Sequence, residues 1–209
     1  MDKKRGVFIA FEGIDGCGKT TQIKKFVHYL FDKHKHNHIV FTRNPYKDVN
    51  IRAILREDDD ALTQAEKLAE LFIADRKKQA EEAIEPALGK GFFVVTDRYK
   101  LTTIAYQGAQ GLDMRELAKK HDSLPVPNLT IVVDVPAQIA GERMKKDMER
   151  KTEQKFEKNL EFLENVRQNM LKSGEILKGE RILVVDGTKS PDETFSEIVG
   201  IFEREIDGE

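Results

Sequence analysis

Residues 13–20 read GIDGCGKT and match the pattern G-x-x-x-x-G-K-[ST], whose residue types suit phosphate binding. An apolar run over 7–11 precedes the motif, and a helix-like stretch over 22–31 follows it. In this order the glycines let backbone N–H groups approach phosphate oxygens, and the helix N-terminus adds a partial positive charge. The motif therefore predicts that the chain binds a nucleoside triphosphate, the alternative being a chance glycine turn.

Two side chains of the motif carry the expected chemistry. Lys19 would reach the β- and γ-phosphates as a positive charge, and the hydroxyl of Thr20 would bind Mg²⁺. Cys17 stands at a position of free choice, so we expect a small filler there and not a nucleophile. The predicted ATP-binding residues of this loop are Gly13, Ile14, Asp15, Gly16, Cys17, Gly18, Lys19, Thr20 and Thr21.

Five short apolar runs elsewhere in the chain have the length and composition of buried parallel strands, and helical patterns fill the intervals between them. This alternation predicts an α/β fold in which a five-stranded parallel sheet carries helices on both faces. The length of 209 residues fits a single domain, 1–209, with an ample core. The five expected strands are 7–11, 39–42, 92–96, 130–133 and 182–185.

Ligands of such sheets bind at the carboxyl ends of the strands, and polar residues follow several of these runs. Asp97 ends the third run and is expected to hold Mg²⁺ or its water, while the planar guanidinium of Arg98 would bind a phosphate. A structural ion pair is the alternative for these two residues. Asp134 and Asp186 follow the fourth and fifth runs, where we favour helix-capping or turn roles.

Composition narrows the class of protein. The net charge of −2 argues against a nucleic-acid or anionic-membrane surface, and no apolar stretch approaches the length of a membrane span. A single cysteine excludes a disulfide framework and fits a reducing cytoplasm. The chain lacks the Asn-Lys-x-Asp motif that reads guanine and is short for a motor or helicase. We therefore expect a small cytoplasmic kinase.

The segment 64–88 is predicted to be the helix that faces the phosphoryl acceptor. Its apolar residues follow helical spacing, and the same face then reaches Asp75 and Arg76. Phe72 and Arg76 are four residues apart, so they project side by side from a helix. Such a pair would stack on a flat base and donate to its carbonyl edge; the alternative is a helix that simply emerges into solvent.

Several segments resemble thymidylate kinases, in order along essentially the whole chain. Residues 11–22, FEGIDGCGKTTQ, are similar to the opening of these enzymes, and 71–76, LFIADR, to their base-binding helix. Residues 97–99, DRY, and 102–108, TTIAYQG, resemble the most diagnostic stretch of the family. The remaining similar segments are FE at 156–157, FLENVR at 162–167 in the style of archaeal members, and DGT at 186–188 beside the adenine.

The resemblance implies a nucleoside monophosphate kinase fold with a mobile lid, and transfer of the γ-phosphoryl group of ATP to dTMP with Mg²⁺. It implies an acceptor-binding region over about 43–107, a homodimer, and catalytic roles for Asp15, Lys19 and Arg98. Arg98 would hold the dTMP phosphate, Asp15 the 3′-hydroxyl, and Tyr106 would exclude a ribose 2′-hydroxyl. The implied dTMP-binding residues are Asp15, Phe72, Arg76, Arg98, Thr103, Tyr106 and Gln107, and Thr188 is added to the ATP-binding set.

Gly16 stands where one group of these kinases has a basic residue in the phosphate loop. The other group has glycine there and supplies the arginine from a lid, which predicts a lid over about 142–156 with Arg150 as the catalytic arginine and Arg143 in support. A lid would also exclude water from the γ-phosphate. Because the segment mixes basic and acidic residues, a solvated helix is the alternative.

Asn44 departs from the Thr-Arg-Glu-Pro-Gly sequence that is usual in bacterial members, which puts the geometry of the acceptor loop in question. Lys47 or Arg52 would supply a second phosphate contact, and the sequence does not choose between them. Two other functions remain open: a related kinase for UMP/CMP or deoxynucleosides, and a non-catalytic ATP-binding switch. The Phe72 and Arg76 pair, with Tyr106, argues against the related kinase, and the switch would leave the acceptor-side residues without a function.

Overall fold

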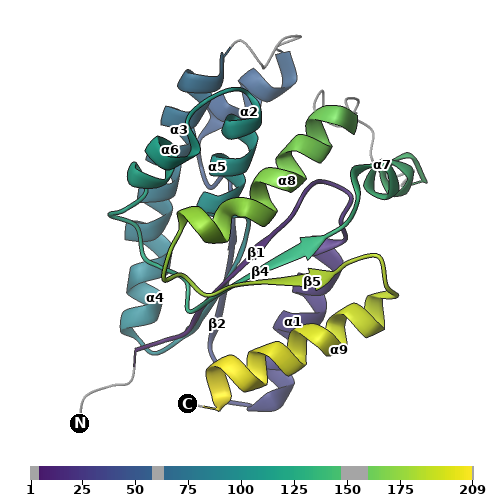
Figure 1. The fold of residues 1–209 in the computed structure, drawn as a ribbon. Coiled ribbons are helices and arrows are strands. Elements are labelled where there is room, and N and C mark those ends of the chain that lie inside the picture. The colour runs from purple at the N-terminus through teal and green to yellow at the C-terminus, as the bar shows by residue number, and fades with distance from the viewer. Residues whose placement is uncertain (1–4, 58–63, 147–159, 209) are drawn as a thin grey trace.

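The sheet has five parallel strands in the order β2-β3-β1-β4-β5 (Figure 1). The computed structural model describes residues 5–57, 64–146 and 160–208. All five predicted strands are confirmed, each boundary within one residue of its apolar run. The strands are β1 Phe8–Glu12, β2 Ile39–Arg43, β3 Phe93–Asp97, β4 Leu129–Asp134 and β5 Ile182–Asp186.

The strand register brings the polar strand ends together at one edge of the sheet. Every residue of the central strand β1 is buried, as expected for a strand covered on both faces. Phe11 of β1 lies opposite Asp97 of β3, and Asp97 lies opposite Arg43 of β2. Asp134 of β4 is likewise paired with Asp186 of β5.

Helices cover both faces of the sheet, as predicted (Figure 1). On one face α1, Lys19–Lys33, packs beside α9, Pro191–Phe202, whose start has a capping box between Ser190 and Glu193. The rings of Phe26 and Phe202 join these two helices with their centroids 5.2 Å apart.

The opposite face holds the predicted acceptor helix. It runs as α3, Ala65–Gln79, through a π-helical turn, Ala80–Ile84, into α4, Glu85–Gly89, and so confirms helix over most of 64–88. The other helices of the described residues are α2 Val49–Glu57, α5 Lys100–Ala109, α6 Met114–Lys119, α7 Ala137–Lys146 and α8 Leu160–Ile176, with a π-helical turn at Glu203–Asp207.

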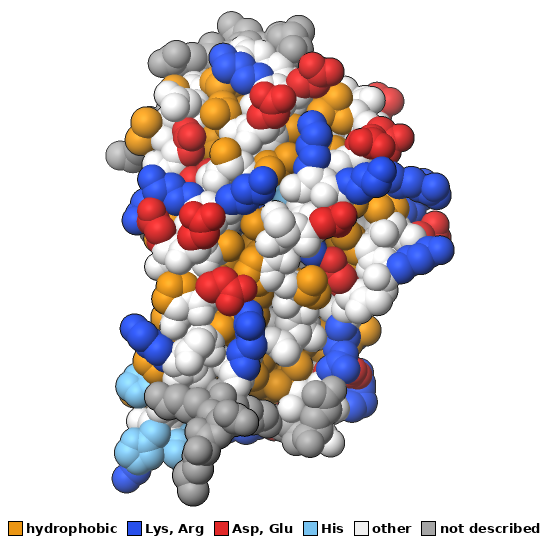
Figure 2. All heavy atoms as spheres, turned by 90° about the vertical axis from the view of Figure 1, so that its left-hand side faces the viewer, with side chains coloured by type: hydrophobic (Ala, Val, Ile, Leu, Met, Phe, Trp, Pro, Cys, Tyr) orange, Lys and Arg blue, Asp and Glu red, His pale blue; other side chains and the backbone are white. Residues whose placement is uncertain are grey.

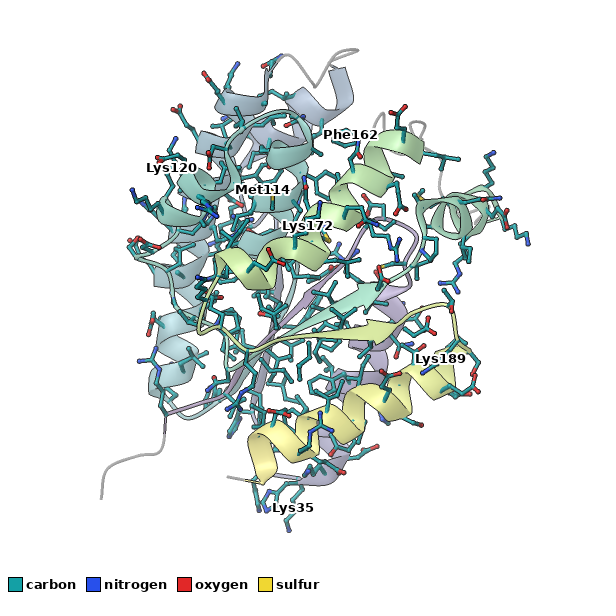
Figure 3. The ribbon with its side chains drawn as sticks, in the orientation of Figure 1. Lys35, Met114, Lys120, Phe162, Lys172 and Lys189 are labelled. Atoms are coloured by element: carbon teal, nitrogen blue, oxygen red, sulfur yellow. The ribbon has the colours of Figure 1, made fainter. Side chains whose placement is uncertain are left out.

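Helix α5 is buried between α3 and α8, and its contacts with these two helices fix the positions of its side chains. Met114 from α6 and Phe162 from α8 (both labelled in Figure 3) pack against it. A Cβ atom at Gly108 would lie 2.6 Å from Cγ of Met114, so this close approach requires glycine. The ring of Phe162 lies 6.2 Å from that of Tyr106.

Figure 2 shows the face at the left of Figure 1, where α3, α4 and α6 lie, with basic, acidic and hydrophobic side chains interspersed. Among the described residues, no helix combines the length and apolar character needed to cross a membrane. The predicted lid lies mostly beyond this part of the chain, since α7 is described only to Lys146.

Candidate active site

The phosphate loop lies between β1 and α1, as its sequence predicts. Gly13, Gly16 and Gly18 have φ angles of 143°, 81° and 95°, which only glycine adopts without strain. A Cβ atom at Gly13 would also lie 2.7 Å from the carbonyl oxygen of Val133. The glycine spacing of the motif is therefore required by the backbone of the loop.

Lys19 begins α1 with its ammonium folded back over the loop. Nζ donates to the carbonyl oxygens of Gly13 at 2.9 Å and Ile14 at 3.0 Å. Thr20 and Thr21 follow at the exposed start of the helix. This is the arrangement predicted for a triphosphate site, with the cation and the free N–H groups of the helix N-terminus on one side.

Asp15 of the loop joins two residues that the sequence predicts for the acceptor. Its carboxylate accepts from Nη2 of Arg98 at 2.5 Å and from the hydroxyl of Tyr106 at 3.3 Å. Burial alone would lower the pKa of Arg98, but the acidic groups around it, Asp15 foremost and then Asp97 and Glu12, together outweigh burial and raise that pKa well above its ordinary value. Burial raises the pKa of Tyr106. The structure therefore brings Asp15, Arg98 and Tyr106 into one cluster against the phosphate loop.

The backbone of Arg98 has a φ of 67°, in the left-handed region that few side chains adopt. Its N–H donates to the carbonyl oxygen of Phe11 at 2.9 Å, and its own carbonyl accepts from the hydroxyl of Thr96 at 2.9 Å. Strained residues of this kind persist where the surroundings fix them, often at functional sites. The guanidinium of this residue is the one that contacts Asp15.

Glu12 is completely buried and positions the start of α5. One carboxylate oxygen accepts from the N–H groups of Tyr99 at 2.9 Å and Thr102 at 3.2 Å, and the other accepts from the Thr102 hydroxyl. Burial raises the pKa of this carboxyl. Glu12 is the last residue of β1, and its hydrogen bonds to the start of α5 align the helix that carries the predicted acceptor residues.

The predicted Mg²⁺ ligands lie on one groove of about 680 Å³, which both Thr20 and Asp97 line. Oδ2 of Asp97 accepts from Arg43 at 3.3 Å. Its Oδ1 is buried and has no hydrogen-bond partner within the described chain. A carboxylate oxygen without a partner and a helix-start hydroxyl are both oxygen ligands of the kind that Mg²⁺ takes. The two residues present therefore fit the metal.

The two residues of α3 that are predicted to read the base differ in how deeply they are buried. Phe72 is half-buried, whereas Arg76 is completely buried. Nη1 of Arg76 lies 2.9 Å from Nε2 of His121, and its Nε and Nη2 have no partner among the described residues. Burial lowers the pKa of Arg76 to about 10. The arginine is thus held inside the protein with two donors unused.

Unused buried polar atoms mark the acceptor side of the site. Within the described part of the chain six residues have such side-chain atoms, and four of them are predicted site residues. Because leaving a buried polar atom unpaired costs about 1–3 kcal/mol each, a concentration of such atoms is typical of a surface that binds a polar ligand. The four residues are Arg76, Asp97, Thr103 and Gln107.

Two residues that were not predicted from the sequence hold the segment 44–48, which follows β2 and is the predicted acceptor loop. The Asp75 carboxylate accepts from the backbone N–H groups of Tyr46, Lys47 and Asp48, at 2.8 Å and 2.9 Å for the latter two. Gln79, also buried, accepts from Asn44 at 2.6 Å. The apolar stripe that ends in Asp75 was the available signal for the first; no sequence pattern marks the second.

The two candidates for a second phosphate contact remain unresolved by these contacts. Nζ of Lys47 pairs with Glu82 at 2.6 Å on the surface, and Arg52 is exposed on α2.

At the strand ends, Asp186 accepts from the N–H and hydroxyl of Thr188, which confirms a turn role for it. Asp134 instead forms a two-bond ion pair with Arg167 at 2.6 Å and 2.8 Å.

Arg143 is the described arginine of the predicted lid segment. Its Nη1 donates to the carbonyl oxygens of Gly187 at 2.9 Å and Cys17 at 3.4 Å, so it joins α7 to the phosphate loop and to the turn beside Thr188. Arg150, the predicted catalytic arginine, lies outside the described residues.

Together, the phosphate loop, the parallel sheet and the acceptor cluster define a phosphate-loop enzyme of the nucleoside monophosphate kinase class. A family model described as "Thymidylate kinase" matches residues 11–198. The chain belongs to the thymidylate kinase family. It is 36% identical to the thymidylate kinase of Thermosipho africanus over 96% of this chain and 99% of the relative. It is also 36% identical to a probable thymidylate kinase of Pyrococcus horikoshii, over 98% and 99% of the two chains. It is 37% identical to the thymidylate kinase of Carboxydothermus hydrogenoformans, over 95% of this chain and 98% of the relative.

Proposed function

We propose that this protein transfers the γ-phosphoryl group of ATP to dTMP and so forms dTDP and ADP. The observation that carries the proposal is the contact of Arg98 with Asp15 at 2.5 Å. It puts a phosphate-binding fork and a sugar-binding carboxylate directly against the loop that would hold the donor. Family membership supports the same reaction.

The reaction requires little covalent chemistry from the protein. An oxygen of the dTMP phosphate attacks the γ-phosphorus as the bond to the β-γ bridging oxygen breaks, and ADP leaves with the electron pair. Arg98 would hold the attacking phosphate in line, and Lys19 would exchange its carbonyl partners in the loop for the β- and γ-phosphates. Catalysis then comes from positioning and from neutralised charge.

Thr20 and Asp97 would hold Mg²⁺, which neutralises charge on the transferring phosphates when it is bound. The remaining proposed ATP contacts are those of the loop 13–21 and Thr188. We also propose a single domain over 1–209, a homodimer, a cytoplasmic location and a catalytic role for Arg150 in a lid over about 142–156. These four rest on the sequence resemblance.

Selection of the acceptor would come from α3 and α5. Phe72 would stack on thymine, and Arg76 would donate a hydrogen bond to its O4. Cytosine has an amino group at this position, which cannot accept that hydrogen bond. Thr103 and Gln107 have buried oxygens without partners in the described chain and would contact the nucleotide from α5. Tyr106 would lie against C2′, where a ribose hydroxyl would clash.

An acceptor panel tests the proposal. ADP formation from ATP·Mg²⁺ would be measured with dTMP, dUMP, UMP, dCMP, AMP, GMP or thymidine as the sole acceptor. We expect fast turnover with dTMP, slower turnover with dUMP, and little with the others. Lys19→Ala is the control that should abolish every rate. Comparable rates on UMP or dCMP would indicate the related kinase, and no acceptor-dependent rate would indicate the nucleotide switch.

A further inference from the structure

His121 is a buried histidine that no motif explains. It lies just after α6 and its side chain is buried. Its Nε2 lies 2.9 Å from Nη1 of Arg76, and its Nδ1 lies 2.7 Å from the carbonyl oxygen of Leu117. The ring therefore connects the end of α6 to the arginine on α3.

The partners of His121 decide its tautomer. The carbonyl of Leu117 only accepts, so Nδ1 must carry a proton to form that bond. The guanidinium of Arg76 only donates, so Nε2 must be the bare acceptor. The imidazole is consequently neutral. The pKa of His121 agrees, since burial and the Arg76 charge lower it to about 3.

This single acceptor leaves one edge of the guanidinium available. Nε and Nη2 form adjacent donors along one side of the planar fork, and both are buried without partners in the described residues. A carboxylate in place of the imidazole would pair with two nitrogens at once and compete for that edge. Glu12 and Asp75 instead act on Arg76 through charge, and the guanidinium carbon lies 5.7 Å from the centroid of the Tyr99 ring.

We propose that His121 is a positioning residue for base recognition, which holds Nη1 of Arg76 and presents the Nε and Nη2 edge to a carbonyl oxygen of a pyrimidine base. The inference rests on the proposed function, because it assumes that Arg76 reads the base. It adds that discrimination between keto and amino pyrimidines depends on a neutral acceptor at the end of α6.

Three substitutions separate this role from support of the fold. His121→Leu removes both hydrogen bonds. His121→Asn retains a donor near the Nδ1 position for the Leu117 carbonyl but is too short to reach Arg76. His121→Gln extends an amide oxygen to about the position of Nε2 and can accept from the guanidinium. The readout is the ratio of kcat/KM for dTMP to that for dCMP, with kcat and KM determined separately and ATP-analogue binding as a folding control.

We expect the dTMP to dCMP ratio to fall at least about tenfold in His121→Leu and His121→Asn, mainly through a higher KM for dTMP. His121→Gln should stay within about threefold of the wild-type ratio. If His121 has a purely structural role, its replacement should lower kcat/KM for dTMP and for dCMP by the same factor. The ratio would then be unchanged, and that result would overturn the proposal. If His121→Leu does not fold, the comparison of Asn with Gln decides the question by itself.

Arg76→Leu distinguishes failure of this inference from failure of the proposed function. If Arg76→Leu keeps the wild-type ratio, Arg76 does not read the base, and the roles proposed for Arg76 and His121 are both overturned; failure of the proposed function itself would instead appear as an absent or unselective rate with dTMP in the acceptor panel. If the dTMP to dCMP ratio falls in Arg76→Leu but stays at the wild-type value in His121→Asn, only the role of His121 is overturned. In the Arg76→Leu background, His121→Asn should cause no further loss of selectivity, since the two residues would act as one unit.

Discussion

Arg98 donates to Asp15 at 2.5 Å, so the residues proposed to bind the phosphate and the sugar of the acceptor neutralise each other. Both side chains are largely buried, with exposed fractions of 16% and 21%. A dTMP phosphate would replace the carboxylate as a partner of the guanidinium, and the 3′-hydroxyl would then donate to Asp15. Acceptor binding would thus exchange one charged contact for two.

Asp15→Ala should lower kcat/KM for dTMP by roughly 10–100-fold, because a hydrogen bond to a charged group contributes about 1.5–3 kcal/mol. The wild-type protein should discriminate against 3′-deoxy-dTMP by a similar factor, and the variant should not discriminate. Steady-state kinetics with the two acceptors measures both effects. Asp32→Ala removes an exposed carboxylate from α1 and is the matched control. Undiminished discrimination in Asp15→Ala would remove Asp15 from the sugar site.

Arg98→Ala and Arg98→Gly should both lower the rate with dTMP by about 10³-fold or more, since each removes the charge beside the transferring phosphate. Their stabilities should differ. Arg98 has a φ of 67°, which glycine adopts freely, so the glycine variant should be about 1 kcal/mol more stable than the alanine variant in urea unfolding.

The control for that comparison is Lys78, which is exposed in the last turn of α3, where the helical backbone continues into the π-helical turn Ala80–Ile84. There the order should reverse, with Lys78→Gly about 1 kcal/mol less stable than Lys78→Ala. Equal stabilities of the two Arg98 variants would mean that the left-handed backbone at this position stores no strain.

The strands and the phosphate loop could be predicted from the sequence because their signals are local. Buried parallel strands read as continuous apolar runs, and the loop needs glycine at the positions where φ is positive. The cluster of Asp15, Arg98 and Tyr106 was also predictable, since its members lie in the loop and in one segment after β3.

Other parts of the site depend on partners far apart in the chain. Gln79 reaches Asn44 and His121 reaches Arg76 across gaps of 35 and 45 residues, and no spacing in the sequence marks either pair. The complete burial of Arg76 could not be predicted from the sequence either, because helical periodicity indicates on which face of a helix a residue lies and not how deeply it is buried. Such contacts become evident only when buried donors and acceptors are paired in three dimensions.

Asn44→Glu, which restores the residue usual in bacterial members, should destabilise this protein. Nδ2 of Asn44 donates to the fully buried Gln79 at 2.6 Å, and a carboxylate there could only accept while carrying a charge into a buried site. We expect a loss of about 2–4 kcal/mol in urea unfolding. The KM for dTMP should rise as well, because Asn44 also contacts the carbonyl of Arg98.

Asn50→Glu makes the same change on an exposed residue of α2 and should alter stability by less than about 0.5 kcal/mol. If Asn44→Glu is as stable as wild type, Gln79 must adapt its amide to the carboxylate. The departure from the bacterial sequence would then carry no structural consequence.

His121 should make the protein sensitive to acid. Its pKa is lowered from about 6.5 to about 3 in the folded state by burial and by Arg76, so the unfolded chain binds the proton first as the pH falls. Stability from this group is therefore complete above about pH 6.5 and is lost progressively down to about pH 3. At pH 4 the loss should reach about 3 kcal/mol relative to pH 7.

His121→Gln has no proton to take up at this position and should lose about 3 kcal/mol less than wild type between pH 7 and pH 4. Urea unfolding of both proteins at the two pH values measures the difference, in which the titration of all other groups cancels. His36→Gln, on an exposed ring, should retain the wild-type loss. An identical loss in His121→Gln and wild type would show that the imidazole takes up its proton as readily in the folded protein as in the unfolded chain, which is incompatible with a buried, bare Nε2 accepting from Arg76.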